Sequence, residues 1–432
     1  MTSDLQCSND IIFLSLNKIM SNLSIEPTNH LYKSKKFLIS SQSSNDNSNN
    51  QDYKEKLNSL KKDLENCKTI VEKYYLGIPD AFLSTIESNK ISKNLIPENF
   101  SPLMTILDPF RTFKYQVMNN YFAQDVNSVW FKYWEILKEF NLVPNSKNDE
   151  TFFICESSKH LQNIQSGLSS VNHFIKTQKN IKSLVWYSII PNNLSTNNSN
   201  TNNSNTNNII NQDKDTNLIK NYPKNFIQQN QEAFDKCDVL LSHAVLSNIE
   251  KQNYNKQELE FLPILKEQYQ ILINNIKIGG NLVMKTFSFF ENETIDIFYE
   301  CFKMFEKFYI YKPISSKITN SEIFLIGVNF IGNQNSSNNK TVPTWFLEQL
   351  VNIASEIYRD QIIALQYITR MYDKIIHQVC ELNLDNNIQK SLVSNVCKEV
   401  KSIFKNEHNK ITNEWLKLYP ICSLKNKDKL RI

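Results

Sequence analysis

Residues 279–330, GGNLVMKTFSFFENETIDIFYECFKMFEKFYIYKPISSKITNSEIFLIGVNF, decide the fold of this 432-residue chain. A short apolar run, 281–284, follows two glycines and ends at Lys285. In the next segment, apolar side chains recur at the spacing of one helical face. They are Ile295, Phe298, Tyr299, Phe302 and Phe305. Two runs rich in aromatic and β-branched residues, 308–313 and 323–330, then predict two strands. The order strand, helix, strand, loop, strand is typical of the closing half of an open α/β sheet.

Three segments within this stretch, GGNLVMK (279–285), KPISSK (312–317) and NSEIFLIG (320–327), resemble a known family. They are similar to the last third of the FtsJ-type 2′-O-ribose methyltransferases, most of all to the divergent branch carried by large cytoplasmic DNA viruses. The resemblance implies a Rossmann-like α/β sheet that uses S-adenosylmethionine. It also implies a Lys-Asp-Lys-Glu tetrad, whose third and fourth members Lys285 and Glu322 match. The alternative is that Lys285 is a surface lysine at a strand end and Glu322 a solvated loop acid, but the preserved register and spacing favour the family assignment.

The first tetrad lysine is expected within 110–143, which reads as one helical segment. The part SVWFKYWEIL (128–137) resembles the helix that supplies this lysine in the family. Lys132, which lies off the apolar stripe of that helix, is therefore our first candidate, and Lys114 is the second. Either could instead be an ordinary exposed lysine.

The strand TFFICE (151–156) resembles the one after which the family's Pro-Gly-rich loop wraps the cofactor. Here the residues that follow, ESSKHLQNIQSG (156–167), contain a single glycine, and a helix is predicted over 167–178. The candidate cofactor-binding residues are Glu156, Ser157, Ser158 and Gly167. Glycine lets the backbone approach a ligand closely. The loop therefore predicts weakened or lost binding of S-adenosylmethionine.

The segment CDVLLSHA (237–244) resembles the strand that ends on the family's catalytic aspartate, but His243 stands at that position. No acidic residue occurs between Asp238 and Glu250. A neutral imidazole could accept a hydrogen bond from Lys285, whereas a protonated one would repel it. Together with the cofactor loop, this replacement predicts absent or very weak methyl transfer.

The chain is expected to divide into three parts. A helical N-terminal extension, 1–109, contains a disordered stretch at 41–53. The methyltransferase domain covers 110–332 and is interrupted by an Asn/Ser/Thr-rich insertion at 192–208. A helical region, 344–432, ends the chain. Within the domain we also predict a strand over 182–191 and a long amphipathic helix from 254 back to Gly279.

Composition sets mild limits on function. The net charge of +4 permits an RNA partner without requiring one. Eight cysteines without CxxC or CxH spacing predict neither a zinc site nor a disulfide framework, and no other metal site is expected. No apolar run approaches the roughly 18–20 residues of a membrane span. We therefore expect a cytoplasmic protein, located in the host cytoplasm or the virion if it is viral.

Two classes of function stay open. The first is a S-adenosylmethionine-dependent RNA 2′-O-ribose methyltransferase that acts on capped mRNA or on rRNA. The second is a catalytically inactive member of the family, retained as an RNA-binding or scaffold component. In either case the helical extensions could contact other proteins.

Overall fold

The computed structural model describes most of the chain, and only the described residues are discussed below. They are 2–23, 25, 31–41, 50–76, 100, 103–143, 151–157, 161–179, 181, 183–189, 236–243, 254–333, 341–382 and 384–430. The predicted insertion at 192–208 and the candidate Ser158 lie outside these ranges.

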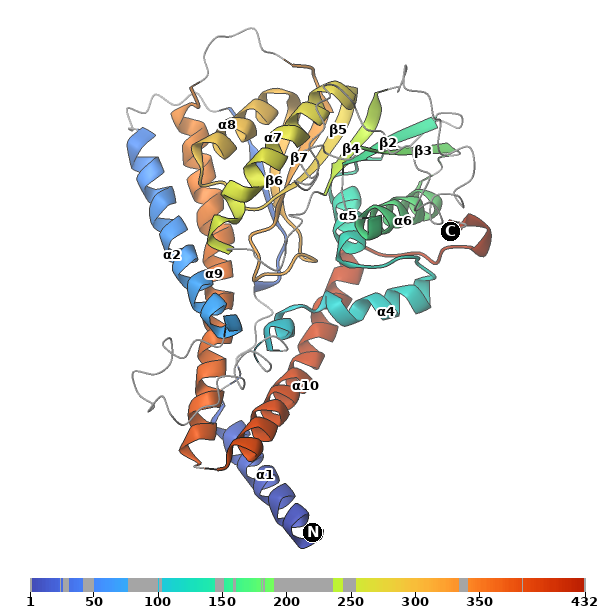
Figure 1. Ribbon diagram of the computed structural model, residues 1–432. Helices are drawn as coiled ribbons and strands as arrows, with labels where there is room; N and C mark the ends of the chain where they lie inside the picture. Colours follow the sequence, from blue (N-terminus) through green and yellow to red (C-terminus); the bar gives the residue numbers. More distant parts are fainter. Residues whose placement is uncertain are drawn as a thin grey trace, which may run out of the picture.

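Seven strands form one mixed sheet in the order β1-β6-β7-β5-β4-β2-β3 (Figure 1). The strands are β1 (Lys35–Ile39), β2 (Thr151–Ser157), β3 (Ser183–Ile189), β4 (Cys237–Ser242), β5 (Ile276–Thr286), β6 (Phe305–Lys312) and β7 (Ile323–Phe330). β3, β2, β4 and β5 are parallel to one another, whereas β7 is antiparallel to both of its neighbours, β5 and β6. This confirms the strand predicted at 323–330 and the predicted Rossmann-like α/β class.

Helices cover both faces of the sheet. The α-helices are α1 (Thr2–Asn22), α2 (Asn50–Leu76), α4 (Phe110–Tyr121), α5 (Ser128–Glu139), α6 (Leu161–Gln178), α7 (Gln257–Asn275), α8 (Asn292–Lys303), α9 (Thr344–Glu381) and α10 (Asn386–Leu418). α5 and α6 pack in the core on one face, while α7 and α8 pack in the core on the other. Because side chains alternate along a strand, Leu282 and Met284 of β5 join the second core and Val283 joins the first. Burial on both faces explains why the central strands are almost wholly apolar.

β2 lies at the point where the strand order reverses. From β2 the chain passes to β3 on one side and later to β4 on the other side. Open α/β sheets bind ligands at the carboxyl ends of the strands next to such a switch point. Here those ends carry Ser157 on β2 and Ser242 on β4.

Residues 1–109 were predicted to be helical, but within them Lys35–Ile39 form the edge strand β1. β1 pairs antiparallel with β6, from Lys35 opposite Lys312 onwards. The predicted disorder at 41–53 is also wrong for 50–53, which form the first turn of α2. α2 is held there because its apolar side packs against α9, beside which it runs in Figure 1.

The segment 110–143, predicted as one helix, is two helices. Phe122 and Asp125 between them have positive φ angles of 55° and 47°. Asn127 then caps α5, since its side chain accepts a hydrogen bond of 2.7 Å from the backbone N–H of Val129. The break lets α5 turn into the core while α4 stays at the surface.

Two predicted boundaries shift along the chain. The helix predicted over 167–178 begins earlier, at Leu161, so Gly167 lies inside α6 and not at its first position. The helix predicted to run up to Gly279 ends at Asn275, and β5 starts at Ile276. Gly279 has φ of +80°, a left-handed conformation that favours glycine, and it marks an irregularity in β5 where the pairing with β4 shifts register.

The C-terminal region is helical as far as Leu418. Beyond it, Pro420 removes a backbone donor, and residues 419–430 form a tail without α-helix at the end of the predicted helical region. The tail folds back on the domain: Trp134 donates its indole N–H to the Tyr419 carbonyl at 3.3 Å. None of the described helices has a stretch both long and apolar enough to cross a bilayer.

Candidate active site

A buried ion-pair cluster joins three elements of the domain. Lys132 comes from α5, Lys285 from the end of β5, and Glu322 directly precedes β7. Because β5 pairs with β7 from Thr286 opposite Ile323, Glu322 is carried to Lys285. The Lys132 Nζ lies 2.6 Å from Glu322 Oε1, and the Lys285 Nζ lies 3.3 Å from Glu322 Oε2. One carboxylate therefore bridges the two ammonium groups.

Burial controls the charges of this cluster, since its three side chains are 3–5% exposed. Burial lowers the pKa of Lys285 to about 8, although Glu322 works in the opposite direction. Burial alone would raise the pKa of Glu322, but the charges of Lys132 and Lys285 outweigh it and hold that pKa well below its usual value. Glu322 is therefore ionised at neutral pH, while Lys285 is close to releasing its proton.

His243 lies level with Lys285 on the neighbouring strand, because Ser242 of β4 pairs with Met284 of β5. Its backbone N–H donates to the Ser157 carbonyl at 3.1 Å, which extends the pairing of β4 with β2. Burial lowers the pKa of His243 well below its usual value, and the charges of Lys285 and Lys132 lower it further. The imidazole is thus neutral at neutral pH and does not repel the lysines.

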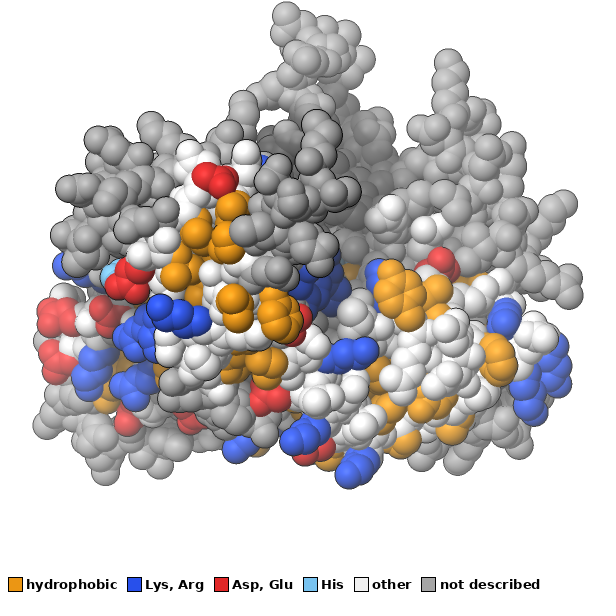
Figure 2. All heavy atoms as spheres, turned by 90° about the horizontal axis from the view of Figure 1, so that it is seen from below, with side chains coloured by type: hydrophobic (Ala, Val, Ile, Leu, Met, Phe, Trp, Pro, Cys, Tyr) orange, Lys and Arg blue, Asp and Glu red, His pale blue; other side chains and the backbone are white. Residues whose placement is uncertain are grey.

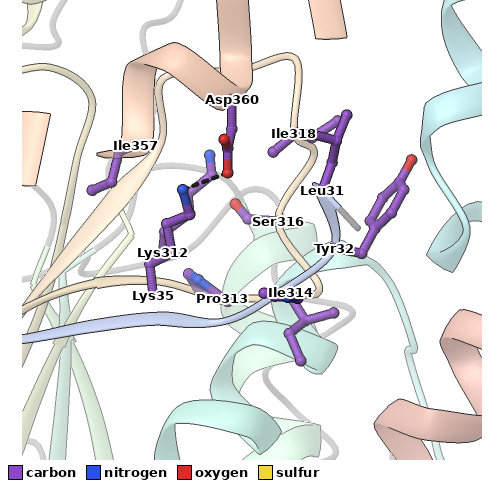
Figure 3. Close-up of a pocket in the computed structure, with 11 residues that line it drawn as sticks. Leu31, Tyr32, Lys35, Lys312, Pro313, Ile314, Ser316, Ile318, Ile357 and Asp360 are labelled. Atoms are coloured by element: carbon purple, nitrogen blue, oxygen red, sulfur yellow. Dashed lines mark ion pairs between the residues drawn. The ribbon is translucent and has the colours of Figure 1, made fainter. Parts of the chain in front are cut away.

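The loop between β6 and β7 holds Glu322 in place. Ser316 donates its hydroxyl to Glu322 Oε1 at 2.5 Å. Lys312, which is 5% exposed, donates to the Glu322 carbonyl at 2.7 Å and to the Asn320 carbonyl at 2.8 Å. Burial lowers the pKa of Lys312 to about 7. Figure 3 shows Lys312 and Ser316 at a small hollow closed by β1 and α9, which are joined by the ion pair of Lys35 with Asp360.

Glu135 anchors the start of the same loop to α5. Its carboxylate is completely buried and accepts hydrogen bonds from four residues. The donors are the Ile314 N–H (2.7 Å), the Ser315 N–H and hydroxyl (3.1 and 2.7 Å), the Tyr311 hydroxyl (2.7 Å) and the Trp415 indole (2.9 Å). Since Lys132 stands one turn earlier on α5, Glu135 fixes the distance between that lysine and the loop that carries Ser316.

A second group of polar side chains lies at the switch point. Glu156 is completely buried, and burial raises its pKa well above the usual value. The hydroxyls of Ser157 and Ser242 are buried and make no hydrogen bond to any described residue. Gly167 faces this group, because a Cβ there would lie 2.8 Å from Tyr133 Cε2 and 3.2 Å from Glu156 Oε1. Buried hydroxyls without partners at a switch point are suited to a polar ligand.

The structure thus brings together Lys132, Lys285, Glu322 and His243, and it places Glu156, Ser157 and Gly167 beside them across Tyr133. Lys114 does not join them: it lies on α4, with its Nζ 4.9 Å from the centroid of the Tyr115 ring. No cluster of metal-ligating side chains occurs among the described residues.

Sequence reasoning gave no role to three residues of this site. Lys312 and Ser316 both lie in KPISSK, the segment used above only for the resemblance, and Glu135 lies in SVWFKYWEIL. For Lys312 and Glu135 the signal was a charged residue beside apolar ones, which does not reveal its partners; for Ser316 the sequence offered no signal.

Comparison with known proteins finds similarity over the central part of the chain. Residues 175–330, from within α6 to the end of β7, match the family described as FtsJ-like methyltransferase. A protein of African swine fever virus named probable methyltransferase is 25% identical over 283 residues, which make up 60% of this chain and 63% of that protein. A cap-specific mRNA (nucleoside-2′-O-)-methyltransferase of Autographa californica nuclear polyhedrosis virus is 39% identical over 93 residues, covering 22% of this chain and 35% of that protein.

The extent of these matches matters for the site. The family match contains His243, Lys285 and Glu322, whereas Lys132 and Glu156 lie before it. The chain spans less than two thirds of the length of the African swine fever virus relative. An uncharacterized protein of Acanthamoeba polyphaga mimivirus is also similar, with 22% identity over 240 residues, 51% of this chain and 28% of that protein.

Proposed function

We propose that this chain, which carries an FtsJ-like methyltransferase domain, methylates ribose 2′-hydroxyls of RNA, with capped mRNA as the substrate class. The observation that carries the proposal is the buried cluster in which Glu322 bridges Lys132 and Lys285. It lies at the carboxyl end of β5, on the ligand-binding edge of the sheet. The capped substrate is inferred from the baculovirus relative named above.

The methyl donor implied by the family is S-adenosylmethionine, which supplies an electrophilic methyl group on a sulfonium. The residues at the switch point fit such a group. Ser157 and Ser242 offer buried hydroxyls that no described residue satisfies, and Glu156 offers a buried carboxyl that a cationic ligand would help to ionise. We assign these three residues to holding the donor. Gly167 leaves the space that Tyr133 and Glu156 occupy.

Within the cluster, Lys285 is the group suited to take the proton from the 2′-hydroxyl. A general base works best when its pKa lies near the working pH, and burial lowers the pKa of Lys285 to about 8. Its Nζ is also held less closely by Glu322 than that of Lys132, at 3.3 Å against 2.6 Å. Lys132 therefore serves to fix and neutralise Glu322, and Glu322 stabilises the charge that Lys285 acquires.

The replacement of aspartate by His243 is compatible with this role. A carboxylate beside Lys285 would favour the charged ammonium, whereas the neutral imidazole leaves more of the amine free at neutral pH. The expected loss of activity rested on the missing carboxylate and the missing glycines. The first of these is offset by the low pKa of Lys285. Of the loop that lacks glycines, residues 158–160 lie outside the described ranges, while Ser157 and Gly167 lie at the switch point described above.

The test is methyl transfer from radiolabelled S-adenosylmethionine to capped RNA by the full chain. Lys285→Met should lower the rate about 10²–10⁴-fold, the usual contribution of a general base. Lys266→Met, which removes a half-exposed lysine of α7, should leave it unchanged. Equal rates for wild type and Lys285→Met would refute the role of Lys285. Absence of transfer by a wild-type chain that binds RNA would instead favour the non-catalytic alternative. RNA as partner and a cytoplasmic site of action belong to the same proposal.

A further inference from the structure

α4 carries an outward face with exposed aromatic, apolar and basic side chains. Its inward face packs into the core, but Tyr115, Met118 and Phe122 are 59%, 39% and 50% exposed. Arg111, one turn before Tyr115, is exposed as well. Soluble helices normally present polar side chains to solvent. A stripe of exposed aromatic groups therefore points to a partner.

The conformation of Phe122 supports this view independently. It ends α4 with φ of 55°, in the left-handed region where glycine and asparagine are favoured at helix ends. The backbone of Phe122 is strained by this conformation, and burial of its half-exposed ring does not offset the cost. Residues held in such conformations cluster at functional sites.

Lysine ammonium groups lie over both exposed rings. The Lys114 Nζ is 4.9 Å from the centroid of Tyr115, and the Lys429 Nζ is 5.3 Å from that of Phe122. Rings flanked by cations suit a ligand that carries both flat bases and phosphates. Among protein partners, no class is singled out by this combination.

Lys429 belongs to the C-terminal tail, which is fixed beside α4. The Leu424 N–H donates to the Tyr121 carbonyl at 3.0 Å, and the Leu430 N–H donates to Gln124 Oε1 at 2.7 Å. The Lys-rich segment 425–430 is thereby held next to the end of the helix. Basic residues exceed acidic ones across these elements: Arg111, Lys114, Lys425, Lys427 and Lys429 stand against Asp125 and Asp428. Figure 2, the view from below, shows basic, acidic and apolar side chains interspersed over the described part of that face.

The beginning of α4 is close to the catalytic cluster. Lys317 of the β6–β7 loop forms an ion pair of 3.3 Å with Asp108, just before α4. The neighbouring Ser316 donates to Glu322. From that point α4 is about 18 Å long, at 1.5 Å per residue.

We propose that the α4 platform, formed by the outward face of α4 and the tail segment 425–430, binds the single-stranded part of the RNA substrate next to the catalytic cluster. This inference rests on the proposed function for its choice of ligand. Bases stack on Tyr115 and Phe122, and the lysines beside the rings neutralise the adjoining phosphates.

Two substitutions test the platform without threatening the fold. Tyr115→Ala places the best helix former at an exposed helical position, and Phe122→Asn places a residue that tolerates positive φ. Binding of the full chain to a fluorescein-labelled single-stranded RNA of about a dozen nucleotides is followed by anisotropy, without methyl donor. Each substitution should weaken binding about 5- to 150-fold, as loss of one base–aromatic stack does. Leu259→Ala, a matched truncation of a 49% exposed residue on α7, should have no effect.

A salt titration gives a second readout. Lys114→Gln and Lys429→Gln should each reduce the slope of log K against log salt by about 0.7, the value for one phosphate contact with a single strand. Unchanged RNA affinity in both aromatic variants would overturn the proposal. Because the assay requires no turnover, its outcome is distinguishable from that of the methyl-transfer test.

Discussion

Replacing His243 by aspartate tests how the buried cluster sets the charge of its lysine. The substitution restores the residue type expected from the family and places a carboxylate level with Lys285 on the adjacent strand. Two effects then compete. The carboxylate could orient the amine, but it also stabilises the charged ammonium, which cannot accept a proton.

The structure allows the second effect to be estimated. An opposite charge about 4 Å away is worth about 4 kcal/mol at an effective dielectric constant of about 20. Such neighbours shift pKa values by about one to three units. A shift of about two units would raise the pKa of Lys285 from about 8 to about 10. At pH 7.5 the uncharged fraction would then fall from about a quarter to below about one hundredth.

We therefore expect His243→Asp to transfer methyl groups roughly 50- to 100-fold more slowly than wild type at pH 7.5, and to recover as the pH approaches 10. The assay is single-turnover methyl transfer to capped RNA between pH 6.5 and 10. His243→Asn, which removes the imidazole without adding charge, should keep the wild-type pH dependence. Side-chain NMR of Lys285 gives the same pKa without turnover. Faster transfer by His243→Asp at pH 7.5 would refute the reasoning, because orientation would then outweigh charge.

Three further results are expected. Lys285 binds its proton less tightly in the folded than in the unfolded chain, so the free energy of unfolding should rise with pH between about 8 and 10.5. In urea unfolding, Lys285→Met should gain about 2 kcal/mol less stability than wild type between pH 7.5 and 9.5. An equal gain in both proteins would contradict a buried amine at this position. Gly167→Ala should lose about 1 kcal/mol in the same assay, because crowding against Tyr133 exceeds the gain in helix propensity, and a more stable variant would show that the contact relaxes freely. Glu135→Gln should lower the free energy of unfolding by about 2–3 kcal/mol and slow methyl transfer, because the NH2 group of glutamine would face N–H and O–H donors that now donate to a carboxylate oxygen. Glu139→Gln, nearer the surface, should have neither effect.

Part of this architecture could be predicted because it depends on local pattern. The strands at 308–313 and 323–330 and the helix between 292 and 303 follow from apolar runs and helical spacing. The pairing of Lys285 with Glu322 could be anticipated only from the register of a resembling family. Their catalytic roles stay a prediction.

Other features depend on contacts between distant segments and leave little trace in the sequence. β1, KKFLI, is a strand because β6 has an open edge, and its two lysines hide its character. Lys312 and Glu135 read as surface charges, yet they are 5% and 0% exposed, since backbone groups and hydroxyls of remote elements surround them. The division between α4 and α5 depends on the cap at Asn127, which an apolar stripe running through both segments conceals.

The most direct measurement compares two capped RNAs that differ at one atom. One carries a ribose 2′-hydroxyl at the first transcribed nucleotide, and the other carries 2′-deoxyribose there. We expect the full chain to transfer labelled methyl from S-adenosylmethionine to the first RNA, with the label recovered on the 2′-oxygen after nucleoside digestion, and not to the second. Equal labelling of both RNAs, or label recovered on a base, would show that Lys285 and Glu322 do not serve 2′-O-ribose methylation.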